Sequence, residues 1–211
     1  MFRFTIFGIP VEVQPFFWIT LVILGASGGA DSKEAIFEIV LFVLAGFVSI
    51  LVHELGHALT ARRFGANVYI VLEAFGGYAA YSGARTSRKQ SFLITAAGPA
   101  IQIALGFVML GLQKVVPPMN SYGNYFLDML MFISFFWAII NLLPVVPLDG
   151  GRMVEAALGP ARIKITLWIS IVTAIVAAVL MFSLTRSIIF PIFLAMFAWQ
   201  AYQRLNENGW R

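Results

Sequence analysis

The stretch IFEIVLFVLAGFVSILVHELGHALTA, residues 36–61, is a long apolar run that carries three ionisable side chains close together. The run is longer than the about 20 apolar residues that a helix needs to cross the hydrocarbon core of a bilayer. His53, Glu54 and His57 lie within it, among Leu, Val, Ala and Gly. An ionisable residue inside a membrane helix is costly and by default marks a functional site. The stretch therefore predicts a membrane helix that contains such a site.

The composition of the whole chain agrees with a membrane protein. Of the 211 residues, 60% are hydrophobic and 11% charged, and the mean hydropathy is +0.88. A soluble globular domain is far less apolar. Further apolar runs lie at about 14–30, 92–113, 126–144, 164–183 and 188–203. With residues 36–61 they predict an all-α polytopic membrane protein with six transmembrane helices in a single domain, residues 1–211.

The positions of the cations predict how these helices are oriented. If the N-terminus lies in the cytoplasm and the chain crosses six times, eleven of the fourteen Lys and Arg residues, Arg211 among them, fall on the cytoplasmic side. Positive charge is enriched in cytoplasmic loops. We therefore expect both termini in the cytoplasm, with the lipid bilayer as a partner. The positions of these basic residues are accounted for by the membrane topology and need no nucleic-acid binding to explain them. No nucleic-acid partner is therefore expected.

Two segments have strand-like patterns. Residues 2–15 alternate around Gly8 and Pro10 and predict an N-terminal strand pair, with an interfacial leader as the alternative. Residues 67–83, between the second and third helices, are rich in β-branched and aromatic residues and contain Gly76, Gly77 and Gly83. They predict a re-entrant strand or hairpin that lines a cavity, because non-helical backbone at membrane depth must be satisfied by protein or water. A packing loop over the site is the alternative.

The motif HELGH, residues 53–57, has the spacing of a metal-dependent hydrolase. Residues four apart on a helix share one face, so His53 and His57 can bind one zinc ion while Glu54 acts as general base. Zinc in a catalytic site takes three protein ligands and leaves a position open for water. With no cysteine in the chain and both histidines used, the third ligand is expected to be a carboxylate.

Depth in the membrane separates the possible carboxylates. His53 lies nine residues before Arg62, about 13 Å from the cytoplasmic end of its helix. Asp149, in NLLPVVPLDGGR at residues 141–152, follows two prolines and precedes two glycines. Such an irregular segment can fold back and present a carboxylate at depth. Glu73 in the strand-like segment is the second choice, and Glu155 is closer to the surface.

Taken together, these motifs resemble the site-2 proteases, intramembrane zinc metalloproteases that carry out regulated intramembrane proteolysis. The resemblance rests on HELGH, on Gly98-Pro99 and on the Asn-x-x-Pro-x-x-Pro-Leu-Asp-Gly-Gly pattern at 141–151, and it covers residues 53–151. It implies that Asp149 completes the zinc site. This chain has Gln102 and Gln14 where the family often has Asn and His, which puts an accessory role at those positions in doubt. It resembles a minimal member without PDZ or CBS domains.

The resemblance also implies how substrate is held and which substrates are cleaved. Asn141 is expected to bind the substrate backbone or the oxyanion, although a helix-capping role is the alternative. Independently of the resemblance, the strand-like pattern of the segment containing Gly76 and Gly77 suggests that its edge binds the substrate in extended form by strand addition. The implied partners are single-span membrane proteins, with anti-sigma factors, membrane-tethered transcription factors and signal-peptide remnants as the candidate classes. The expected location is the inner cell membrane of a prokaryote, with the opening of the active site toward the cytoplasm.

Two other functions use the same residues. A membrane metal transporter or metal-binding protein would need the ligands but not Glu54. A catalytically inactive relative that acts as a membrane chaperone would need neither the metal ligands nor Glu54. The presence of His53, Glu54, His57 and Asp149 together argues against this function. Replacement of Glu54 by Gln distinguishes a protease from a metal carrier.

Overall fold

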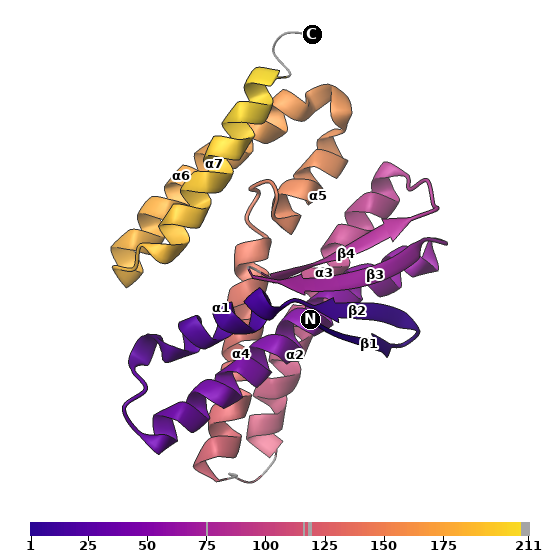
Figure 1. Ribbon diagram of the computed structural model, residues 1–211. Helices are drawn as coiled ribbons and strands as arrows, with labels where there is room; N and C mark the ends of the chain where they lie inside the picture. Colours follow the sequence, from indigo (N-terminus) through magenta and orange to yellow (C-terminus); the bar gives the residue numbers. More distant parts are fainter. Residues whose placement is uncertain (75, 116, 118–119, 208–211) are drawn as a thin grey trace. The chain divides into compact units, whose positions relative to one another are not determined.

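The chain is mostly helical and contains one small sheet (Figure 1). The computed structural model describes residues 1–74, 76–115, 117 and 120–207. Arg211, one of the cations counted above, lies outside these residues. Two compact units are present, the first formed by residues 1–85 and 97–138 and the second by residues 86–96 and 139–211. A single domain over residues 1–211 stays a prediction.

The sheet lies in the first unit and has the strand order β1-β2-β3-β4. An N-terminal hairpin of β1 (Phe2–Ile6) and β2 (Ile9–Val13) confirms the predicted strand pair, and a second hairpin of β3 (Asn67–Glu73) and β4 (Gly76–Ser82) occupies the predicted strand-like segment. Both hairpins are antiparallel, whereas β2 and β3 run parallel and join them into one sheet. A re-entrant position for the second hairpin stays a prediction.

The first hairpin is anchored to the end of a membrane-length helix. Phe7 and Gly8 form its turn with φ angles of 51° and 74°. Two positive φ angles are typical of the two-residue turns whose twist matches that of antiparallel strands. The guanidinium of Arg62, in the last turn of α2, donates a hydrogen bond to the carbonyl oxygen of Phe7. This contact fixes the N-terminal hairpin beside the helix that carries HELGH.

Helix α2 (Lys33–Arg63) is the longest element of the first unit. Ser32 begins it, because its hydroxyl accepts a hydrogen bond from the Ala35 amide at 3.0 Å. Arg62 and Arg63 in the last turn are favourable at the negative end of the helix dipole. Its 31 residues extend over about 46 Å, more than the about 30 Å of a hydrocarbon core.

Small residues let the other helices of the first unit approach α2. The short helix α1 (Pro15–Gly25), followed by η1 (Ala26–Gly28), packs on α2 at Gly46, where an added Cβ would lie 2.8 Å from Leu21 Cδ2. A Cβ at Gly56 would lie 2.6 Å from the carbonyl oxygen of Ala97, in helix α3 (Arg88–Val115). Such close contacts are typical of helix pairs in membranes.

Helix α4 (Ser121–Asn141) completes the first unit through its residues up to Ala138. A Cβ at Gly106 of α3 would lie 2.8 Å from the ring of Phe135, so α3 and α4 also pack closely. The largest core cluster of this unit joins the sheet to α1 and α2 and includes Ile9, Phe17, Leu55 and Ile70. The sheet therefore rests on the half of α2 that carries the ionisable residues.

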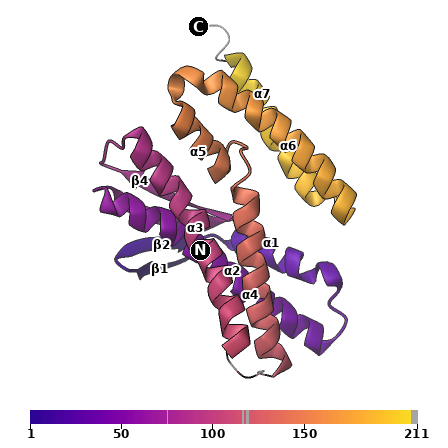
Figure 2. The ribbon, with the colours of Figure 1, turned by 180° about the vertical axis from the view of Figure 1, so that it is seen from behind.

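The second unit contains α5 (Asp149–Leu158), η2 (Pro160–Arg162), α6 (Ile163–Thr185) and α7 (Ile189–Glu207). Helices α6 and α7 lie side by side in both ribbon views (Figure 2). The Ser170 hydroxyl accepts a hydrogen bond from the Val146 amide at 3.1 Å, and Arg204 pairs with Glu155 at 3.0 Å. These contacts hold the segment before α5, and α5 itself, on the α6–α7 pair.

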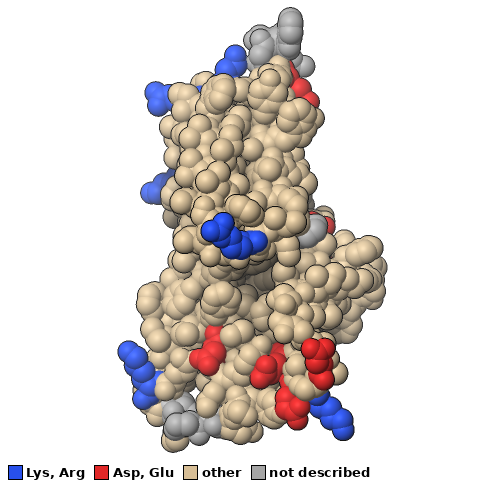
Figure 3. Space-filling view, turned by 90° about the vertical axis from the view of Figure 1, so that its left-hand side faces the viewer, with Lys and Arg blue, Asp and Glu red and all other residues tan. Residues whose placement is uncertain are grey.

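Among the residues that the structure describes, four helical segments are long and apolar enough to cross a membrane: Lys33–Arg63, Arg88–Val115, Ser121–Asn141 and Pro160–Thr185. They correspond to four of the six predicted spans. The predicted range 14–30 forms the 11-residue α1, about 16 Å long, and the range 188–203 forms α7. Six spans therefore stay a prediction. The face drawn in Figure 3 has broad areas without Lys, Arg, Asp or Glu, as a lipid-facing surface requires.

Candidate metal centre

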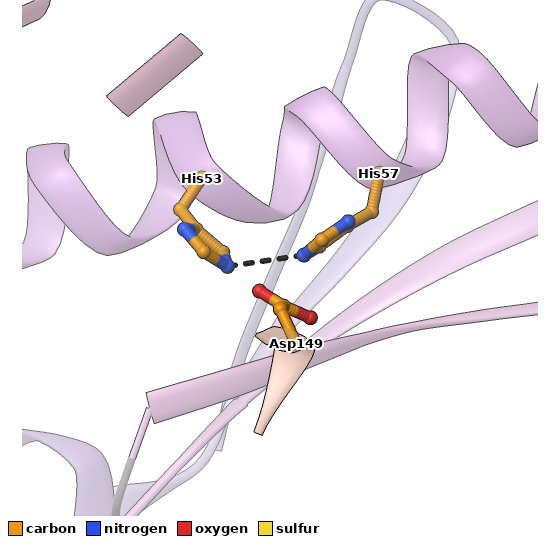
Figure 4. A group of neighbouring side chains, drawn as sticks. All are labelled: His53, His57 and Asp149. Atoms are coloured by element: carbon orange, nitrogen blue, oxygen red, sulfur yellow. Dashed lines mark hydrogen bonds between the residues drawn. The ribbon is translucent and has the colours of Figure 1, made fainter. Parts of the chain in front are cut away.

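His53 and His57 lie one turn apart on α2, and their imidazole rings converge (Figure 4). The two Nε2 atoms are 3.0 Å apart, and the ring centroids are 4.7 Å apart with an angle of 79° between the planes. The side chains are buried, with exposed fractions of 3% and 8%. The i, i+4 spacing thus places two metal-binding nitrogens side by side, as the sequence predicted.

Gly98 on α3 leaves space at these two nitrogens. A Cβ at this position would overlap Nε2 of His57 and would lie 2.9 Å from Nε2 of His53. Any side chain at residue 98 would therefore occupy the place where the two nitrogens point. Sequence inspection identified Gly98 as part of a motif but not this role, which depends on the packing of α3 against α2.

Asp149 is the first residue of α5 and is buried, with an exposed fraction of 8%. Its position follows from the two glycines behind it. A Cβ at Gly150 would overlap the carbonyl oxygens of Leu142 and Leu143, and one at Gly151 would overlap the backbone at Val145. The first turn of α5 can therefore lie against the segment that precedes it. A carboxylate is favourable at this helix N-terminus.

His53, His57 and Asp149 form a group that could hold a metal ion, with one ligand atom of each within 4.8 Å of the others (Figure 4). Two imidazole nitrogens and one carboxylate oxygen are a donor set that suits zinc in a catalytic site. Together with the space at Gly98, these donors fit such an ion. Glu73, the second choice for the third ligand, is exposed at the end of β3.

Glu54 lies next to the histidine pair and touches the sheet. Its exposed fraction is 4%, and a Cβ at Gly77 of β4 would lie 2.9 Å from its Cγ. Gly77 thus lets the backbone of β4 approach the carboxylate that the sequence predicts as general base. Gly76 is buried with a φ of 131°, a conformation that L side chains rarely adopt.

β4 is the last strand in the sheet order, and in the described part of the chain only β3 pairs with it. Its sequence, GGYAAYS, has no charged residue. Burial, followed by the negative charge of Glu73, raises the pKa of Tyr78 above its ordinary value of 10.0, so this phenol stays neutral. The strand beside Glu54 therefore presents an uncharged edge.

Asn141 is the last residue of α4 and is partly buried. Its predicted part in substrate binding stays a prediction, as do those of Gly76 and Gly77.

Gln102 is a residue whose contacts the sequence did not reveal. It is fully buried on α3, and its Oε1 is 2.8 Å from Nδ1 of His53. Because the family often has Asn at this position, the presence of Gln put an accessory role here in doubt. The Gln102 side chain nevertheless contacts a predicted metal ligand, His53. Two signals were available: Gln102 lies four residues after Gly98 in an apolar helix, and Ser49, its other partner, lies four residues before His53.

Comparisons with known proteins show which proteins the chain is similar to. A model of peptidase family M50 matches residues 41–120 and 117–185. A zinc metalloprotease of Methanocaldococcus jannaschii is 33% identical over 156 residues, 74% of this chain and 44% of that protein. Stage IV sporulation protein FB of Bacillus subtilis is 30% identical over 145 residues, 68% of this chain and 46% of that protein. The chain thus spans less than half the length of these two relatives.

A solved structure shares the fold. Site-2 protease from Methanocaldococcus jannaschii is similar with a TM-score of 0.67 and 29% identity, over 97% of this chain and 94% of that chain. With the four candidate spans, these relatives indicate an integral membrane protein. Because the family model matches well over half of its residues, the chain belongs to peptidase family M50.

Proposed function

We propose that this chain is an intramembrane zinc metalloprotease that hydrolyses peptide bonds within or near the transmembrane segments of other membrane proteins. The observation that carries the proposal is the group of His53, His57 and Asp149 beside the buried carboxylate of Glu54. The names of the zinc metalloprotease relatives support zinc as the metal. We assign His53, His57 and Asp149 as its ligands.

A zinc ion held by His53, His57 and Asp149 would acidify a bound water and polarise the scissile carbonyl. Glu54 accepts one proton from the attacking water at a carboxylate oxygen, and it returns a proton to the amine nitrogen as the peptide bond breaks. Water is consumed, and a new carboxyl end and a new amino end are formed. Burial of Glu54 keeps bulk water away, which strengthens its interactions with the reacting groups.

β4 supports a way to hold the substrate. A peptide bond in a membrane helix is shielded by its own hydrogen bonds, so the substrate must unwind before attack. An extended segment can pair with the outer edge of β4, which replaces the lost helical hydrogen bonds by strand hydrogen bonds. We assign Gly76 and Gly77 to this contact, because Gly77 lies against Glu54. The uncharged edge suits a segment that comes from the membrane.

Asn141 is proposed to donate a hydrogen bond from its side-chain amide to the substrate backbone or to the oxyanion that develops during attack. The proposed substrates are single-span membrane proteins, and anti-sigma factors, membrane-tethered transcription factors and signal-peptide remnants are the classes to test. Enzyme and substrate meet within the lipid bilayer, and both termini and the active-site opening face the cytoplasm in this proposal.

The test is the co-expression of the chain with a panel of epitope-tagged single-span membrane proteins, in parallel with its Glu54→Gln variant. The wild-type chain should release a cytoplasmic fragment in a metal-dependent manner. Loss of a general base lowers the rate about 10²- to 10⁴-fold, so the variant should release essentially none while it retains zinc. Fragment release is followed by immunoblotting, and zinc is measured on the purified protein.

Glu34→Gln is the matched control, because Glu34 is an exposed carboxylate at the start of the same helix. It should cleave like the wild type. Release of the fragment by Glu54→Gln would contradict the proposed mechanism. Zinc-dependent transport that continues in Glu54→Gln, without cleavage by the wild type, would identify a metal carrier instead.

A further inference from the structure

We propose that Gln102 is a positioning residue for the metal centre: it holds His53 in the tautomer whose Nε2 can bind the ion. The inference rests on the proposed zinc site and concerns a residue that touches neither substrate nor metal. It depends on a chain of buried hydrogen bonds within the first unit, formed by side chains of α2, α3 and α4.

The hydrogen bonds begin at His53 and end on α4. Oε1 of Gln102 is 2.8 Å from Nδ1 of His53. At the other end of the same amide, Nε2 is 2.9 Å from the hydroxyl of Ser49 and 3.4 Å from its carbonyl oxygen. The Ser49 hydroxyl is in turn 3.0 Å from that of Ser134. Gln102, Ser49 and Ser134 are each fully buried.

Ser49 determines which way the amide of Gln102 points. A carbonyl oxygen can only accept hydrogen bonds, so the NH₂ group of Gln102 must face it. The reverse orientation would place two carbonyl oxygens against each other in a buried site, where an unsatisfied polar group costs about 1–3 kcal/mol. The amide oxygen therefore faces His53.

That oxygen determines the tautomer of His53. Because Oε1 only accepts, Nδ1 of His53 must donate and must carry a hydrogen. A neutral imidazole has a single N–H, so Nε2 then carries the electron pair that can bind a metal ion. Nε2 of His53 is the atom that faces Nε2 of His57 at 3.0 Å, beside Gly98. Gln102 thus directs the metal-binding electron pair of His53 into the metal centre.

Contacts of this kind have a measurable effect on metal binding. Removal of the group that accepts from the second nitrogen of a metal-binding histidine lowers metal affinity by about 10- to 100-fold. A residue that only fills space between α2 and α3 would instead change the stability of the protein with and without zinc to the same extent. Metal affinity and histidine tautomer therefore distinguish positioning from packing.

The first experiment measures zinc affinity of the purified full chain in detergent by competition with a chelator of known affinity. Gln102→Leu removes the acceptor at similar volume and should bind zinc about 10- to 100-fold more weakly. Gln102→Glu keeps an acceptor for Nδ1–H, but its second oxygen faces the Ser49 carbonyl oxygen, so it should bind zinc more weakly than the wild type and more tightly than Gln102→Leu. Gln113→Leu is the matched control, because it makes the same change on the same helix at a side chain that contacts Asp128 and lies outside these hydrogen bonds, and it should bind like the wild type.

The second experiment records the imidazole ¹⁵N signals of the zinc-free protein. The chain has two histidines, so the spectrum is simple. In the wild type, one histidine should be held as the Nδ1–H tautomer, whereas Gln102→Leu should show a mixture of tautomers at that ring.

Wild-type zinc affinity in Gln102→Leu, or equal losses in Gln102→Leu and Gln102→Glu, would overturn the inference. If the wild-type chain binds no zinc at all, the proposed function fails instead. In that case the ¹⁵N spectra still decide whether Gln102 fixes the tautomer of His53, because they require no metal.

Discussion

Gly98 illustrates how one missing side chain can decide whether a metal centre forms. A Cβ there would overlap Nε2 of His57, so Gly98→Ala should abolish zinc binding, as measured by metal content after dialysis against zinc. Gly111→Ala is the control on the same helix, because no atom lies within 4 Å of its added Cβ. This variant should keep zinc, and its free energy of unfolding should rise by up to about 1 kcal/mol, since Ala favours a helix over Gly. Equal zinc content in the two variants would contradict this role.

At the scale of one element, α5 depends on a cation from α3. Arg88 donates from Nε to the Ala156 carbonyl at 3.0 Å and from its guanidinium to the Ala157 carbonyl. A Cβ at Gly159 would lie 2.8 Å from the guanidinium carbon, so the glycine makes room for this cap. Because the last carbonyls of a helix lack partners, Arg88→Ala should destabilise α5 by about 1 kcal/mol. Hydrogen exchange of α5 amides should quicken in Arg88→Ala and stay unchanged in Lys89→Ala; identical exchange would refute the cap.

The whole molecule should respond to the metal through its stability. A ligand that binds only the folded state stabilises it by about 2.7 kcal/mol at a hundred times its dissociation constant. For a chain of this size, that raises the melting temperature by roughly 5–10 °C. Chelation should remove the increase. Asp149→Asn should lose most of it, whereas Glu73→Gln, which removes an exposed carboxylate, should keep it. The reverse pattern in a thermal melt would make Glu73 the third ligand.

The sequence by itself determined the features that depend on local spacing. Apolar runs long enough to cross the hydrocarbon core predicted the four membrane-length helices. Strand-like patterns of apolar, β-branched and aromatic residues predicted the two segments that form hairpins. The spacing of His53 and His57 placed two imidazoles on one helix face, because a helix repeats every 3.6 residues. One prediction from local sequence was wrong: the two glycines after Asp149 were expected to allow a sharp backbone turn, but both lie in the first turn of α5 without a positive φ angle. They instead leave space for the backbone of the segment before the helix, which only the packing shows.

Only the tertiary structure decided which distant residues meet. The parallel pairing of Val11 with Ile70 joins two hairpins that the sequence separates by more than fifty residues. The contact of Gln102 with His53, the space at Gly98 and the approach of Gly77 to Glu54 likewise link different elements. Periodicity along one segment reports which face of that segment is apolar. It does not report which neighbour covers that face, because this is set by close packing between segments and by the need to satisfy every buried polar group.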